Sequence, residues 1–182
     1  MFTEKHANAF VCGDEDEEPF ELKSGINVLV QGRYMKEKDK ELFLEKFNDN
    51  LPENASLVGF CVLGGIFSEG IDLKDERLIG AVIVGTGIPM ICRERNILRD
   101  YFDECGKDGY SYAYVIPGMN KVLQAAGRVI RTDTDRGVIV LLDDRFLTRE
   151  YEMMFPREWN KVFPVTLSNA GKCIGDFWKN ED

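Results

Sequence analysis

The apolar positions along this chain follow two alternating patterns from residue 26 onward. Short runs rich in apolar and β-branched residues predict strands at residues 26–30, 57–63, 81–84 and 138–142. Between these runs, apolar residues at helical spacing among charged ones predict helices at residues 36–47, 91–105 and 119–131. A further strand is predicted at residues 112–116, closed by Pro117-Gly118. Wholly apolar strands that alternate with helices are typical of a parallel α/β sheet that is buried on both faces.

The first 24 residues depart from this pattern. Residues 14–18 are consecutive acids followed by Pro19, a composition that repels itself and resists packing. We interpret residues 1–24 as an exposed, partly disordered leader. Residues 25–182 are interpreted as one domain, because this length is enough for one sizeable core. The aromatic residues near the end of that domain are assigned to packing: Tyr151, Phe155 and Trp159.

Composition narrows the classes of function. A net charge of −9 and a pI near 4.8 argue against broad attraction to nucleic acid, so any DNA contact is local or shared with another domain. The five cysteines form no CxxC pair and the single histidine is His6, so we predict neither a metal site nor a histidine-based catalytic triad. With no apolar run near the roughly 20 residues that span a bilayer and no signal-peptide core, we expect a cytoplasmic protein without a membrane partner.

The predicted helix at residues 119–131 carries the most informative chemistry. At about 100° per residue, one stripe contains Asn120, Lys121, Gln124, Arg128 and Arg131. The opposite side is apolar and contains Met119, Val122, Leu123, Ala126, Val129 and Ile130. Guanidinium groups in front of a buried apolar back suit the recognition of phosphate oxygens. The alternative, a solvated polar face, stays open on these residues alone.

Two glycine-containing loops follow predicted strands, where open parallel sheets bind ligands. In residues 64–72, the oxygens of Ser68, Glu69 and Asp72 could accept hydrogen bonds from ribose or hold an arginine, or the loop could be an ordinary turn. Gly85-Thr86-Gly87 begins like a dinucleotide-binding motif. Met90 then replaces the third glycine and Pro89 removes an N–H group, which argues against a nicotinamide site.

A third loop, Asp143-Asp144-Arg145, ends the final predicted strand. Paired acids can hold magnesium, but aspartates at strand ends more often cap a following helix. We therefore predict a helix cap or an ion pair with Arg145.

Two segments together resemble motifs V and VI of superfamily 2 helicases, in the DinG/XPD branch of DNA helicases. They are Gly65-Ile66-Phe67-Ser68-Glu69-Gly70-Ile71-Asp72 and, about fifty residues later, Gln124-x-x-Gly127-Arg128-x-x-Arg131. The strand that ends in Asp143-x-Arg145, and Gln31 before a Lys/Glu-rich helix, are similar to the same branch. The resemblance covers about residues 26–160 and implies an α/β, RecA-like sheet of the P-loop-NTPase type flanked by helices, as in a second helicase motor domain.

The resemblance also implies roles for single residues. Arg128 and Arg131 would be arginine fingers, the catalytic groups that reach the γ-phosphate of ATP. ATP-binding and coupling positions would be Gln124, Glu69, Gly70 and Asp72, and DNA contacts would be Gly65 and Ser68. The implied partners are single-stranded DNA and a first RecA-like domain of the same protein, with translocation in the 5′-to-3′ direction when whole.

This chain also departs from the family pattern. It contains no G-x-x-x-x-G-K-[ST] and no Walker B strand, so ATP and Mg²⁺ would be held mainly by the first motor domain. The four cluster cysteines of the family are absent, so no iron–sulfur cluster is expected in this chain. The leader matches the family's motif IV strand poorly, and Gly87-Ile88-Pro89 replaces the usual Pro-Phe. We expect a C-terminal fragment of a longer helicase that is inactive alone.

Two other functions remain open. A non-catalytic interaction domain could use the basic stripe of helix 119–131 to dock on the acidic surface of a protein, or on nucleic acid. A small-molecule α/β enzyme could instead use the Gly85 loop.

Overall fold

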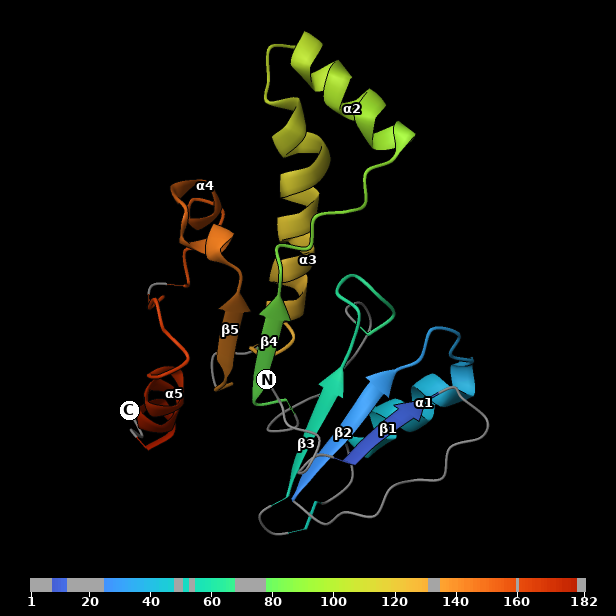
Figure 1. The fold of residues 1–182 in the computed structure, drawn as a ribbon, viewed down its shortest axis with the longest axis vertical. Coiled ribbons are helices and arrows are strands. Elements are labelled where there is room, and N and C mark those ends of the chain that lie inside the picture. The colour runs from blue at the N-terminus through green and yellow to red at the C-terminus, as the bar shows by residue number, and fades with distance from the viewer. Residues whose placement is uncertain are drawn as a thin grey trace. The chain divides into compact units, whose positions relative to one another are not determined.

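Parallel strands flanked by helices form the chain, as the sequence predicts (Figure 1). The computed structural model describes residues 8–12, 25–47, 51–52, 55–67, 78–130, 135–159 and 161–179. The chain divides into two compact units, the first ending at Leu78 and the second beginning at Ile79. No helix in these ranges has the length and apolar character that a membrane crossing requires.

The first unit contains a parallel sheet in the order β1-β2-β3, with β1 at Asn8–Cys12, β2 at Ile26–Gln31 and β3 at Ser56–Phe60. Helix α1 spans Glu37–Lys46, close to its predicted bounds. The register of β1 against β2 runs from Asn8↔Asn27 to Cys12↔Gln31. Residues 8–12 therefore form a strand, although the sequence pattern placed them in the leader. The acidic run at 14–18 lies outside the described residues.

The core of the first unit is aromatic. Phe43 of α1 is 1% exposed and stacks on Phe67, with ring centroids 4.3 Å apart. A Cβ atom at Gly59 of β3 would lie 2.9 Å from the ring of Phe47, so glycine lets this ring approach the sheet closely. Helix α1 is thereby packed on β3, and Phe67 anchors the start of the segment that continues to residue 72.

The second unit is built on one parallel strand pair, β4 at Gly80–Val84 and β5 at Val138–Leu142. Helix α2 (Arg93–Glu104), a π-helical segment η2 (Ser111–Val115) and helix α3 (Ile116–Ala126) connect the two strands. After β5 come η3 (Asp144–Leu147), α4 (Arg149–Glu152) and α5 (Ala170–Lys179). The aromatic rings assigned to packing do pack. The ring centroid of Phe155 lies 6.5 Å from that of Phe146 and 5.3 Å from that of Trp159.

The strand predicted at residues 112–116 is wrong, because this segment is helical. The N–H of Ile116 donates to the carbonyl of Ser111, five residues back, which is the π-helical pattern. Ala113, Tyr114 and Val115 are all buried, so three consecutive side chains pack against neighbours in a way that a half-buried strand would not allow. The π turn comes directly before Pro117, which has no N–H to donate and is tolerated in the first turn of α3.

The prediction that the strands are buried on both faces is wrong for β3 and β4 but fits the central strand β2, where the consecutive residues Val28 and Leu29 are both buried. In β4, Ile83 is 4% exposed, whereas Val82 and Val84 are 62% and 73% exposed. In β3, Phe60 is 50% exposed. In β4 the buried Ile83 therefore alternates with exposed valines, the pattern of a strand that is covered on one face.

Candidate functional site

The structure describes only part of the predicted site. Gln124 and Arg128 lie in the second unit and Gly65 lies in the first. The other predicted site residues lie outside the described part of the chain: Ser68, Glu69, Gly70, Asp72 and Arg131. Gln124 and Arg128 are therefore the predicted residues that the structure brings together.

Arg128 lies in a turn and not, as predicted, within a helix that continues to residue 131. Helix α3 starts at Ile116, earlier than predicted, and ends at Ala126. The N–H of Gly127 donates to the carbonyl of Leu123 at 2.9 Å, and that of Arg128 donates to Ala125 at 3.2 Å. Glycine is a poor helix former and a frequent helix end, which explains the early stop. Gln124 is exposed on the last turn of α3 and the half-buried Arg128 follows it.

Val129 fixes this turn against the strand pair. Its side chain is 5% exposed, and a Cβ atom at Gly137 would collide with its Cγ1 and lie 3.1 Å from the carbonyl oxygen of Ile79. Gly137 and Ile79 directly precede β5 and β4, so Val129 packs at the amino ends of both strands. Arg128 is therefore held at the amino end of the strand pair. Ligands of open parallel sheets usually bind at the opposite edge, beyond the carboxyl ends of the strands.

The predicted apolar back of α3 is largely confirmed. Met119, Val122 and Ala126 are each at most 1% exposed, and they pack with the helix against β4. Ile130, which was assigned to the same side, is 44% exposed because the helix has already ended. The buried back fixes the rotation of α3 and leaves Gln124 on the outer side.

The Gly85 loop packs closely against α3 on one side, at Thr86 to Ile88. Gly85 and Gly87 have φ angles of 81° and 66°, which favour glycine. A Cβ atom at Gly118 of α3 would lie 2.7 Å from the carbonyl oxygen of Thr86 and 2.9 Å from the backbone nitrogen of Ile88. Thr86 is 1% exposed, and its hydroxyl makes no hydrogen bond within the described ranges. This contact favours a structural role for the loop over a small-molecule site.

The loop after β5 has the cap and the ion pair that the sequence predicts. The Asp143 carboxylate accepts from the backbone N–H of Arg145 at 3.0 Å and from its Nε and Nη2 at 2.8 and 2.7 Å. These hydrogen bonds lower the pKa of Asp143 to about 2. Both residues lie at the carboxyl end of β5, the end away from Arg128.

Gln31 organises the predicted DNA-contact loop in the first unit, a role that the sequence did not predict. Its side-chain oxygen accepts from the N–H of Val62 at 2.9 Å. The N–H of Gly65 donates to the carbonyl of Val62 at 2.8 Å, and a Cβ atom at Gly65 would lie 2.9 Å from that oxygen. In the sequence, only the position of Gln31 at the end of a predicted strand pointed to such a role. Its partner Val62 is 31 residues away, so the contact is evident only in the fold.

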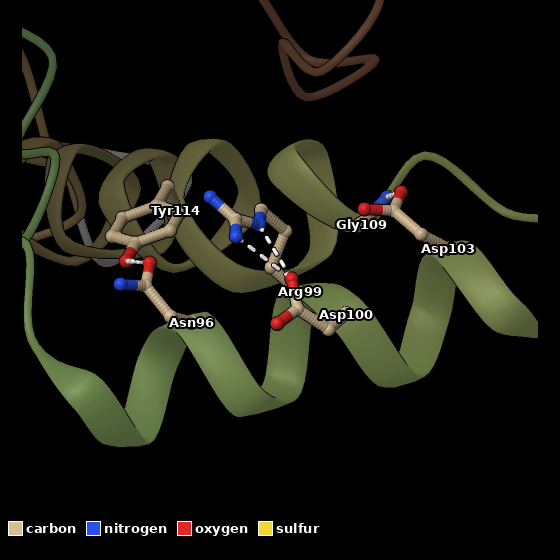
Figure 2. Close-up of polar contacts among 6 residues, drawn as sticks. All are labelled: Asn96, Arg99, Asp100, Asp103, Gly109 and Tyr114. Carbon is tan, nitrogen blue, oxygen red and sulfur yellow. Dashed lines mark hydrogen bonds and ion pairs between the residues drawn. The ribbon is translucent and has the colours of Figure 1, made fainter.

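Polar contacts tie α2 to the segment that leads into α3, and the sequence did not predict them either. The hydroxyl of Tyr114 donates to the side-chain oxygen of Asn96 at 2.8 Å, and the N–H of Gly109 donates to the carboxylate of Asp103 at 2.8 Å (Figure 2). Tyr114 is 1% exposed, so its hydroxyl is satisfied inside the packed helix pair. These contacts position the start of α3 and, through it, the turn that carries Arg128.

The described residues include no group of three His, Cys, Asp or Glu side chains that could hold a metal ion. Four cysteines are free thiols: Cys61, Cys92, Cys105 and Cys173.

Comparison with known proteins identifies similar sequences. Residues 14–162 match the helicase C-terminal domain family. The chain is 32% identical over 135 residues to the ATP-dependent DNA helicase DinG of Photobacterium profundum, an alignment that covers 73% of this chain and 18% of that protein. It is 27% identical over 141 residues to the ATP-dependent DNA helicase YoaA of Haemophilus influenzae, covering 76% and 20%. A regulator of telomere elongation helicase 1 homologue of Caenorhabditis briggsae is 34% identical over 139 residues, covering 70% and 14%. The chain spans about a fifth or less of each relative.

Proposed function

The chain belongs to the helicase C-terminal domain family, and from this premise we propose that it acts as the second RecA-like motor domain of an ATP-dependent DNA helicase. The observation that carries the proposal is the fixed turn after α3. It holds Arg128 beside Gln124 at the amino end of the parallel strand pair, within the residues that match the family.

In this proposal, Arg128 and Arg131 are the arginine fingers. Their guanidinium groups donate hydrogen bonds to the γ-phosphate and stabilise the negative charge that spreads over the transferring phosphoryl group. Gln124, on the last turn of α3, precedes Arg128 by four residues and would add an amide donor and acceptor to the site. A guanidinium stays charged at any physiological pH, so the fingers need no activation.

The segment after β3 is proposed to couple the nucleotide to DNA. Gly65 and Ser68 would contact the backbone of single-stranded DNA, and Glu69, Gly70 and Asp72 would sense the nucleotide. Phe67 supports this assignment, because its buried ring fixes the chain directly before Ser68. The Gln31 contact to Val62 holds the other side of the same loop.

A first RecA-like domain of the same protein is proposed to hold most of the ATP and Mg²⁺. This chain has no Walker A sequence, and its described residues show no group of carboxylates suited to a metal. Hydrolysis would then occur only when the two motor domains close on the nucleotide, and the cycle of closing and opening would move the protein along the strand in the cytoplasm.

The test is steady-state ATP hydrolysis by the whole protein that contains this chain, with and without single-stranded DNA. Arg131→Ala and Arg128→Ala are compared with wild type and with Arg157→Ala, which removes an exposed arginine outside the site. We expect each finger variant to lose about 10³-fold or more in kcat while ATP still binds. Arg157→Ala should keep the wild-type rate.

An unchanged rate in both finger variants would refute the finger assignment. If the same variants then lost binding to a protein or nucleic acid, the non-catalytic interaction domain would become the leading function. The half-buried state of Arg128 speaks against a purely solvated stripe and so favours the motor domain.

A further inference from the structure

Helix α5 contacts the chain directly before β5 through one arginine. The guanidinium carbon of Arg136 lies 4.7 Å from the ring centroid of Phe177 and 5.6 Å from that of Trp178. Its Nη2 also donates to the backbone carbonyl of Phe177. Helix α5, at Ala170–Lys179, lies beyond residue 162, where the match to the helicase family ends. Figure 1 shows α5 beside the lower end of β5.

The chemistry of this contact suits an anchor. Phe177 lies in the last turn of α5, where carbonyl groups have no partner within the helix and carry partial negative charge. The rings of Phe177 and Trp178 stand at 77° to each other, with centroids 5.1 Å apart, so they form a corner around the cation. A planar guanidinium can stack on a ring and donate to a carbonyl at the same time, which an ammonium group does less well.

The contact of Arg136 with α5, which we call the anchor, lies next to the segment that connects Arg128 to β5. Arg136 is followed by Gly137, which packs against Val129, and Val129 follows Arg128. The contact of Val129 with Gly137 therefore joins the described ends of the segment that connects α3 to β5, and we call this contact the base of the segment. Val129 fixes this base on the side of the strands and Arg136 fixes it on the side of α5.

We propose that Arg136 is a positioning residue that fixes this base to α5 and thereby holds Arg128 in the orientation that hydrolysis requires. The inference rests on the proposed function. It adds a role for α5, which acts on Arg128 without touching the nucleotide. A small displacement of catalytic groups has a large effect on rate, so an anchor outside the site can control kcat.

The first experiment measures amide hydrogen exchange in the 182-residue chain, which needs no ATP. Arg136→Ala and, separately, Trp178→Leu should raise exchange several-fold in peptides that cover residues 127–137. Exchange in α1 should stay at the wild-type rate. Trp178→Leu changes only α5, so it tests the anchor even if Arg136→Ala impairs folding. Arg157→Ala is the matched control and should leave residues 127–137 unchanged.

The second experiment measures ATP hydrolysis in the whole protein with the same variants. Arg136→Ala and Trp178→Leu should each lower kcat about tenfold, with the KM for ATP within about twofold of wild type. Arg136→Lys keeps the charge but loses the planar fork, so it should recover only part of the rate. The double variant should be little worse than either single one, because both changes break the same contact.

The outcomes separate the anchor from the proposed function. Unchanged exchange at residues 127–137 in both variants overturns the anchor, whatever the ATPase shows. Raised exchange with an unchanged kcat also overturns the inference, provided that Arg131→Ala abolishes hydrolysis in the same protein. If Arg131→Ala itself leaves the rate unchanged, the proposed function fails, and the catalytic role of Arg136 fails with it.

Discussion

At the scale of single residues, the contact between α3 and the Gly85 loop leaves no room for a side chain at Gly118. An added Cβ would press on the backbone of Thr86 and Ile88, which cannot rotate away as a flexible side chain could. The helix must approach this closely because Met119 and Val122 next to it are fully buried. Glycine at 118 is therefore explained by space and not by backbone flexibility.

We predict that Gly118→Ala destabilises the protein by about 1–3 kcal/mol, the usual cost of overpacking. Urea unfolding followed by circular dichroism measures the change. Gly171→Ala on α5 is the control, since nothing lies within 4 Å of its added Cβ. Alanine at that helical position should be neutral or stabilising by roughly 0.5–1 kcal/mol. A stable Gly118→Ala variant would mean that the helix and the loop are farther apart in solution.

The Asp143–Arg145 pair gives a prediction about pH. Hydrogen bonds from Arg145 lower the pKa of Asp143 to about 2, against about 3.9 in an unfolded chain. The pair therefore stabilises the fold fully above about pH 4, and this contribution disappears as the pH falls towards 2. Arg145 is about half exposed, so solvent screening limits the contribution to about 1 kcal/mol.

Asp143→Asn should accordingly lower the free energy of unfolding by about 1 kcal/mol at pH 7. The difference from wild type should shrink when both are measured between pH 4 and pH 2. Asp144→Asn changes the neighbouring exposed carboxylate and serves as the control. A wild-type-to-variant difference that stays constant over this range would exclude the lowered pKa as the cause.

At the scale of elements, the helix pair formed by α2 and the segment leading into α3 is joined by a few partly buried polar contacts. Asp103 accepts from the backbone N–H of Gly109, which closes the turn between the two helical segments (Figure 2). The neighbouring carboxylate of Asp100 instead pairs with the adjacent Arg99 at the surface. The two acids look alike in the sequence, but only one of them joins two elements.

We predict that Asp103→Ala destabilises the chain by about 1 kcal/mol, the usual loss for one hydrogen bond whose donor is left without its partner. Asp100→Ala should produce no measurable change, because its ion pair joins neighbouring residues at the surface. Thermal unfolding of the two variants beside wild type decides the question. Equal effects would show that the turn does not depend on the Asp103 contact.

Elements with a strong local pattern could be predicted from the sequence, and elements shaped by distant contacts could not. The apolar runs of β2, β4 and β5 and the charged helices α1 and α2 have periodicities that no distant contact overrides. Residues 112–116 misled the prediction because aromatic and β-branched residues before a proline are typical of a strand end. Their helical form depends on burial against α2, including the Tyr114 contact with Asn96.

The residue types of the candidate site stay a prediction from the sequence, and their placement in the fold could not be predicted. Gln124, Arg128 and Gly127 belong to a local motif that can be read directly. Their place at the amino end of the strand pair depends on the packing of Val129 against Gly137, a contact that crosses a loop. The anchor through Arg136 was missed for the same reason, because Phe177 is 41 residues away.

At the scale of the whole molecule, the proposed site is incomplete in this chain. The chain contains the proposed finger residues Arg128 and Arg131 but has no Walker A sequence. We predict that the purified 182-residue chain releases no phosphate from ATP above background, with or without single-stranded DNA. A phosphate-release assay measures this, with the whole protein at equal concentration as the positive control. Hydrolysis that copurifies with the chain and disappears in Arg131→Ala would contradict the assignment of ATP binding to another domain.

The parallel pair β4–β5 has charged residues at both of its ends. A five-residue strand is roughly 16 Å long, with Arg128 near one end and the Asp143–Arg145 pair at the other. A small molecule bound by the arginine turn does not reach the opposite loops directly. If the arginine turn binds nucleotide as proposed, any displacement there would have to pass along β4 and β5 to reach the opposite loops. Sensing and response would then be separated in space and joined only by the backbone ladder.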